Sequence, residues 1–128
     1  MIQKLLEIRA AMVLLVMILT VPLTMLAAVA GEKPTAGEIT SAVSDHTYQG
    51  SMSNAGSGFA EYYAPDGTIR GDGYTGKWRT EDGAMCFQYG EDPERCFEVT
   101  VNGPSMVMYK DGDIDGNGML IEGNPLEF

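Results

Sequence analysis

The sequence predicts a mainly β protein: a small antiparallel meander of seven or eight short strands that curls into a barrel or half-barrel, with one short N-terminal helix. Two observations predict it. After Ser44, glycine becomes frequent, and aromatic or β-branched residues alternate with polar ones. Turn sequences such as Asp66-Gly67, Asp82-Gly83 and Asn102-Gly103 also recur at short intervals. A short chain reduces its exposed strand edges by curling such a sheet on itself.

The first thirty residues have the layout of a secretory signal peptide. Two basic residues precede an uncharged stretch over residues 10–30, which ends in Ala28-Val29-Ala30. The alternative is an N-terminal membrane anchor, since 21 uncharged residues can span a bilayer. We therefore expect a signal peptide at 1–30, a single β domain at 31–128, and a periplasmic or secreted protein.

The predicted helix runs from Thr35 to Val43. Thr35 can cap it, and Glu38 stands three residues later, as in a capping box. Ile39 and Val43 lie four residues apart and form a small apolar stripe. A helix this short is stable only when it docks on the rest of the domain.

Alternation and turn residues then mark the strands. The predicted strands are Thr47–Met52, Gly58–Tyr63, Thr68–Gly71, Tyr74–Thr80, Met85–Tyr89, Arg95–Val101 and Ser105–Tyr109, with Met119–Glu122 as a candidate eighth.

The fifth and sixth strands predict a disulfide. If they form a hairpin about Glu91, Cys86 faces Cys96 while Met85 faces Phe97 on the apolar side. An isolated cysteine pair in an exported protein is most simply a disulfide. We expect Cys86 and Cys96 to be bonded.

No residue pattern argues for an enzyme. His46 is the single histidine, and its position before the first predicted strand suits a turn residue better than a general base. Carboxylates are too numerous to single out a catalytic pair. We expect a non-enzymatic protein.

The strand aromatics have two interpretations. They include Trp78 and Phe87, and the simpler expectation is that they fill the barrel. The alternative is a small apolar ligand carrier with an aromatic-lined barrel mouth.

Residues 111–122, DGDIDGNGMLIE, match the spelling of an EF-hand calcium loop. The match lacks helical flanks, and Gly118 occupies a position that is normally apolar and β-branched. We expect an exposed turn and no cofactor. The alternative is weak calcium binding by Asp111, Asp113, Asp115 and Glu122.

Charge limits the choice of partners. Residues 31–128 contain six Lys or Arg and 17 Asp or Glu, a net charge of −11. Such a surface repels nucleic acid and anionic lipid. It suits a cationic envelope protein, and membrane contact is expected only if the N-terminal segment is retained.

The segments FAEYYAPDGTIRG, YTGKWRTEDGAMCFQYG and RCFEVTVNG follow one another, and the chain closes on EGNPLEF. Gly76-Lys77-Trp78 and the cysteine pair are the most specific parts. In this order the chain resembles small exported proteins of Gram-negative, chiefly alphaproteobacterial, origin, over nearly all of residues 31–128. That group has no established function. The resemblance therefore implies export and a β fold, and no activity. Our hypothesis for the role is a binding or structural module of the periplasm or envelope.

Overall fold

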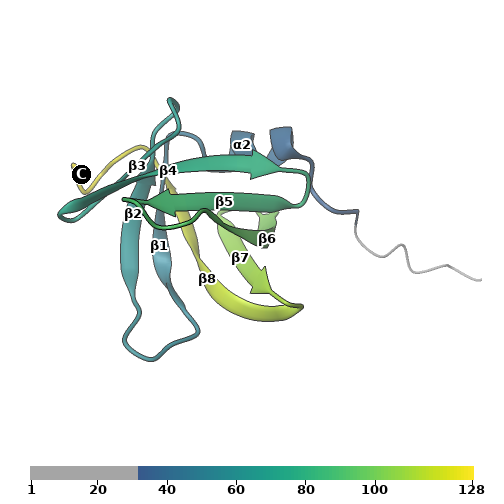
Figure 1. The fold of residues 1–128 in the computed structure, drawn as a ribbon. Helices are drawn as coiled ribbons and strands as arrows, with labels where there is room; N and C mark the ends of the chain where they lie inside the picture. The colour runs from purple at the N-terminus through teal and green to yellow at the C-terminus, as the bar shows by residue number, and fades with distance from the viewer. Residues whose placement is uncertain (1–31) are drawn as a thin grey trace, which may run out of the picture. The chain divides into compact units, whose positions relative to one another are not determined.

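The computed structural model describes residues 32–128, so the predicted signal peptide or anchor lies outside the described residues. These residues form a closed antiparallel barrel in which each strand pairs with the next and the last pairs with the first (Figure 1). The strands are β1 (His46–Met52), β2 (Phe59–Tyr63), β3 (Thr68–Gly71), β4 (Tyr74–Glu81), β5 (Ala84–Tyr89), β6 (Arg95–Asn102), β7 (Ser105–Lys110) and β8 (Asp113–Glu122). The predicted fold class is confirmed, and the barrel is fully closed.

The last strand is longer than its sequence predicts. Only Met119–Glu122 is expected as a strand, whereas β8 begins at Asp113. The added residues, 113–118, run along β7, and Gly116 to Gly118 also pair with β1, opposite Met52 to Gly50. Because this pairing closes the barrel, it extends the strand through a segment whose local composition favours a turn.

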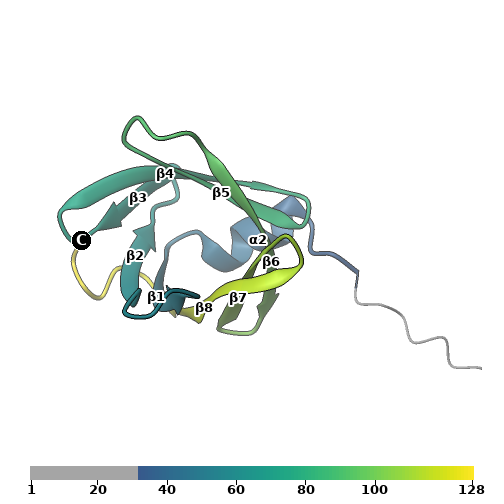
Figure 2. The same ribbon diagram turned by 60° about the horizontal axis from the view of Figure 1, so that its bottom comes forward.

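One helix, α2 (Ala36–Val43), closes one end of the barrel. Thr35 and Glu38 form the predicted capping box, and Ile39 and Val43 are fully buried. The hydroxyls of Thr40 and Thr80 lie 2.7 Å apart, which joins the helix to the end of β4. Figure 2 shows α2 within the outline of the ring of strands.

The half of the barrel next to α2 has a packed interior. Trp78 lies here, and its indole N–H donates to the backbone oxygen of Ala64 at 2.9 Å. The other buried side chains of this half are Tyr63, Ile69, Met85, Val99, Met106 and Leu120. This half supplies the hydrophobic core, while the far half is built differently.

The predicted hairpin register is confirmed. Cys86 faces Cys96 and Met85 faces Phe97 across β5 and β6, and the two cysteines are joined in a disulfide. A structural disulfide points to an oxidising compartment outside the cytoplasm. Among residues 32–128, no helix has the length and apolar character needed to cross a membrane.

Candidate functional site

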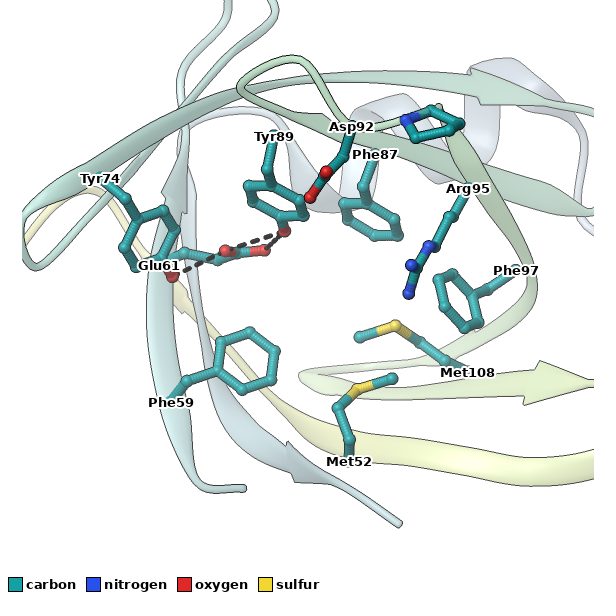
Figure 3. Close-up of a pocket in the computed structure, with 11 residues that line it drawn as sticks. Met52, Phe59, Glu61, Tyr74, Phe87, Tyr89, Asp92, Arg95, Phe97 and Met108 are labelled. Carbon is teal, nitrogen blue, oxygen red and sulfur yellow. Dashed lines mark hydrogen bonds between the residues drawn. The ribbon is translucent and has the colours of Figure 1, made fainter. Parts of the chain in front are cut away.

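A cavity opens at the end of the barrel opposite α2. It has a volume of about 350 Å³. Its walls come from the end of β1, the start of β2, the start of β4, the end of β5 and the facing parts of β6 and β7 (Figure 3). The expectation that side chains fill the interior therefore holds only for the half next to α2.

Most of the cavity wall is apolar. Five side chains supply this surface: Met52, Phe59, Phe87, Phe97 and Met108. They alternate with outward-facing residues along their strands, so each points into the barrel. Phe87 and Phe97 pack edge to face with ring centroids 5.9 Å apart. This lining suits the apolar body of a small molecule.

A buried carboxylate lies at one side of this cavity. Glu61 is only 2% exposed. Tyr63 donates to its Oε1 at 3.0 Å, Tyr74 donates to its Oε2 at 2.9 Å, and the Tyr89 hydroxyl lies 2.8 and 3.0 Å from the two oxygens. Three tyrosine hydroxyls therefore satisfy a carboxylate that has left water. Figure 3 shows Glu61 between the rings of Tyr74 and Tyr89.

Two inward-facing glycines make room for these rings. Gly71 pairs with Tyr74 and Gly76 pairs with Tyr89 across neighbouring strands. A Cβ on Gly71 would lie within 2.6 Å of three atoms of the Tyr74 ring and hydroxyl, and one on Gly76 would lie 2.8 Å from Tyr89 Cδ1. Each ring lies over a residue without a side chain, so both hydroxyls reach Glu61.

Burial governs the titration of the site. Loss of solvent raises the pKa of Glu61, and the hydrogen bonds from Tyr89, Tyr74 and Tyr63 only partly oppose this effect. Burial, followed by the nearby charge of Glu61, raises the pKa of each of these three tyrosines well above its usual range. Their hydroxyls therefore remain protonated donors at neutral pH.

Tyr48 lies beside this cluster. It faces Glu61 across β1 and β2 and is fully buried. Its hydroxyl has no hydrogen-bond partner among the described residues. Burial first, and the charge of Glu61 second, raise its pKa to about 12.

The rim carries one charge of each sign. Asp92 and Pro93 come from the turn between β5 and β6, and Arg95 begins β6. Arg95 is exposed, and Figure 3 places its guanidinium across the cavity from Glu61. The cavity therefore has an anionic side in the barrel wall and a cationic group at its mouth.

The structure does not bring the four predicted calcium ligands together. Asp111 lies in the turn after β7, whereas Asp113, Asp115 and Glu122 all belong to β8. Glu122 lies seven positions beyond Asp115 along the strand, a span of about 23 Å. An EF-hand loop is thus not formed, because the segment is extended and paired on both sides.

One acidic residue of this segment, Asp115, has a role in the strand pairing. Tyr109 pairs with Ile114 and Met108 with Gly116, so Asp115 is the extra residue of a β-bulge. The Ser53 hydroxyl donates to the Asp115 carboxylate at 2.8 Å. These contacts account for the aspartate pattern as a turn followed by a bulge.

The remaining candidate residues lie away from the cavity. His46 begins β1, and its Nδ1 lies 2.8 Å from the backbone oxygen of Ser44. The one group of potential metal ligands within the described residues combines Glu81 with Cys86 and Cys96. Both thiols are consumed by the disulfide, so this group lacks the ligands of a metal site.

No family model, curated protein or solved structure matches the chain. The cavity must therefore be interpreted from its own residues. The sequence predictions do not include its central residue, Glu61. A signal was present in FAEYY: Phe59, Glu61 and Tyr63 occupy alternate positions, so a carboxylate shares a strand face with two aromatics.

Proposed function

We propose that this protein is an exported, non-enzymatic binding module that takes a small molecule with an apolar body into the open end of its barrel. One observation carries the proposal: a cavity of about 350 Å³ combines a mostly apolar wall with a buried polar cluster at Glu61. Small-molecule sites commonly combine a largely apolar lining with a few convergent polar groups. The disulfide supports the export part of the proposal.

The distribution of packing within the barrel supports the same conclusion. Residues next to α2 fill the interior and supply most of the core. The opposite half leaves space between its side chains, although Phe87 and Met108 in its wall also belong to the core. A domain of this size has little core to spare. Space kept beside a buried carboxylate is more simply explained by ligand binding than by stability.

Binding can be tested with the methyl groups of the methionines. Met52 and Met108 line the cavity, Met85 and Met106 are buried in the core, and Met119 is exposed on β8. We expect at least one of phenylbutylamine, phenylbutanol and phenylbutanoate to shift the NMR signals of Met52 and Met108 saturably, without shifting Met119. If none of the three produces a saturable shift at millimolar concentration, the proposal is wrong.

A pair of variants locates the binding. Phe97→Trp places a larger ring in the cavity and should weaken binding, whereas Tyr109→Trp changes an aromatic residue of the adjacent β7 that does not line it. Equal loss of binding in both variants would place the ligand elsewhere. Melting curves of both variants check that the fold is retained.

The alternatives from the sequence stay predictions. The net charge still favours a cationic envelope protein as a partner. Such a complex depends on the surface and weakens with salt. Ligand binding inside the barrel would change little between low and high salt when the ligand is phenylbutanol.

A further inference from the structure

We propose that the ligand is an organic cation: an amine whose ammonium group lies against Glu61 and whose apolar body fills the cavity. This inference depends on the proposed binding function, because it assigns the chemical class of the ligand to the same site. It is carried by the hydrogen-bonding geometry around Glu61, by the charges that face the cavity and by its aromatic walls.

The hydrogen-bond inventory of the site favours a donor as its ligand. Each tyrosine hydroxyl has one proton, and those of Tyr63, Tyr74 and Tyr89 are all directed at Glu61. A carboxylate offers about four acceptor positions, so three donors leave one open. The tyrosine oxygens also keep lone pairs. With Glu61 ionised, the cluster therefore presents acceptors to the cavity and no free proton, as an ammonium with three N–H donors requires. The Tyr48 hydroxyl, which is unpaired within residues 32–128, is not among the groups that line the cavity.

The charge of Glu61 has no cationic partner in the described barrel. The three ion pairs found in residues 32–128 lie on the outer surface and involve Lys33 and Arg79. All groups that hydrogen-bond to Glu61 are neutral hydroxyls. A buried carboxylate gains most from a partner that neutralises it, and a ligand ammonium would supply that charge.

The side chains around Glu61 are those that recognise cations. The rings of Tyr74 and Tyr89 meet nearly edge to face, with centroids 5.9 Å apart, and Phe59 and Phe87 complete the adjoining wall. Aromatic faces attract an organic cation through their quadrupoles. A neutral ligand would gain the apolar contacts of these rings but not this attraction.

The size of the cavity limits the ligand. A liquid water molecule occupies about 30 Å³, so about 350 Å³ corresponds to roughly a dozen non-hydrogen atoms. Phenylbutylamine is of this size. The opposite charge assignment would place a ligand carboxylate against Arg95, but Arg95 is exposed at the rim whereas Glu61 is buried.

A matched ligand series tests the inference. Phenylbutylamine, phenylbutanol and phenylbutanoate share one apolar body and differ in the end group. Calorimetry at neutral pH should rank the amine tightest and the carboxylate weakest. Glu61→Gln should weaken amine binding by about 10- to 100-fold, as expected for the loss of a charge-assisted hydrogen bond, and change alcohol binding less than threefold.

The controls separate this inference from the proposed function. Glu98→Gln removes an exposed carboxylate of β6 and should leave all three affinities unchanged. The Met85 and Met106 methyl signals check that Glu61→Gln keeps the core. If amine and alcohol bind equally, or Glu61→Gln weakens them equally, the ligand class is wrong while the binding function stands.

The Arg95→Gln variant distinguishes an organic cation from an organic anion as the ligand. If phenylbutanoate binds tightest and Arg95→Gln abolishes that binding, the site takes an organic anion and the inference is overturned. An organic cation instead predicts that Arg95→Gln leaves amine affinity unchanged or raises it, because the substitution removes a like charge at the mouth. Binding of none of the three compounds would overturn the proposed function itself.

Discussion

Glu61 has a buried carboxylate that is hydrogen-bonded at both oxygens, yet its burial still disfavours the ionised form. Its carboxylate is 2% exposed, and three tyrosine hydroxyls satisfy it. Burial nevertheless raises its pKa above the ordinary value of 4.5. The folded protein therefore keeps a proton on Glu61 over a pH range in which the unfolded chain has lost it.

The stability of the protein should depend on pH through Glu61. Between 4.5 and the raised folded pKa, the folded state binds more protons than the unfolded state, so the free energy of unfolding falls as pH rises. Glu61→Gln removes this fall in the free energy of unfolding, because glutamine does not titrate. Denaturation at a series of pH values should show the variant gaining stability relative to the wild type through this window, and a constant difference above it.

The facing groups do not obscure this comparison. Tyr48, Tyr63, Tyr74 and Tyr89 have raised pKa values and stay neutral. Groups that are the same in both proteins contribute equally and cancel in the difference. A difference that does not vary with pH would show that Glu61 titrates normally in the folded protein.

The absence of a side chain at Gly76 should be important for both stability and binding, because it makes room for the Tyr89 ring. A Cβ there would lie 2.8 Å from Tyr89 Cδ1 and 2.8 Å from the backbone oxygen of Gln88. We expect Gly76→Ala to lower the free energy of unfolding by about 1–3 kcal/mol, and to weaken amine binding by displacing Tyr89.

Gly58→Ala is the matched control for Gly76→Ala. The nearest atom to a Cβ at Gly58 is 3.9 Å away, so this variant should change stability by no more than about 0.5 kcal/mol. Urea denaturation of the two variants makes the comparison. Equal effects would show that close packing at Gly76 is unimportant.

Among the secondary-structure elements, α2 and β8 complete the barrel in different ways. The helix fills one end of the barrel through Ile39 and Val43. The strand β8 closes the sheet between β7 and β1. Its inward-facing Gly118 lets the Tyr48 ring approach, because a Cβ there would lie 2.6 Å from two atoms of that ring.

Docking of α2 should be essential to stability. Ile39 is fully buried, whereas Ile114 on β8 is 58% exposed. Ile39→Ala should cost about 2–5 kcal/mol, and Ile114→Ala less than about 0.5 kcal/mol. Chemical denaturation of both variants provides the measurement, and similar losses would mean that the helix does not stabilise the barrel.

Calcium should have little effect on the protein. The four candidate carboxylates are spread along an extended segment, with Asp115 at a bulge and Glu122 at the far end of β8. We expect the melting temperature to be the same in millimolar calcium and in EDTA. A rise in melting temperature with calcium that Asp113→Asn abolishes would support the alternative of weak calcium binding instead.

At the scale of the whole molecule, barrel closure and the disulfide constrain the same chain. Cys86 and Cys96 link neighbouring strands on the outside of the barrel, beside Arg79 and its two carboxylate partners. These ion pairs are half exposed and contribute little. The covalent link is the larger stabilising element.

Removal of the disulfide should destabilise the protein without changing its ligand. For a short loop, the chain-entropy model predicts a loss of about 2–3 kcal/mol, which corresponds to a fall in melting temperature of roughly 10–20 °C in a domain of this size. Calorimetry of the Cys86→Ala, Cys96→Ala double variant tests this. An unchanged melting temperature would contradict it.

The local features of this protein can be predicted from its sequence alone. The capping box at Thr35 and Glu38, the first seven strands and the pairing of Cys86 with Cys96 follow from turn residues, alternation and one hairpin register. These depend on interactions between residues close together in the chain. Sequence reasoning could therefore find them without knowing the closed shape.

The full length of β8 and the cavity beside Glu61 depend on contacts that form only in the closed barrel. Residues 113–118 favour a turn locally. They form a strand because β7 pairs with this segment and barrel closure supplies β1 as a second partner for residues 116–118. Glu61, Tyr74 and Tyr89 belong to three different strands and meet only when those strands curve around one interior. Whether a carboxylate faces water or a cavity is a property of that curvature, because the alternation of a strand marks two faces without saying which one lies inside.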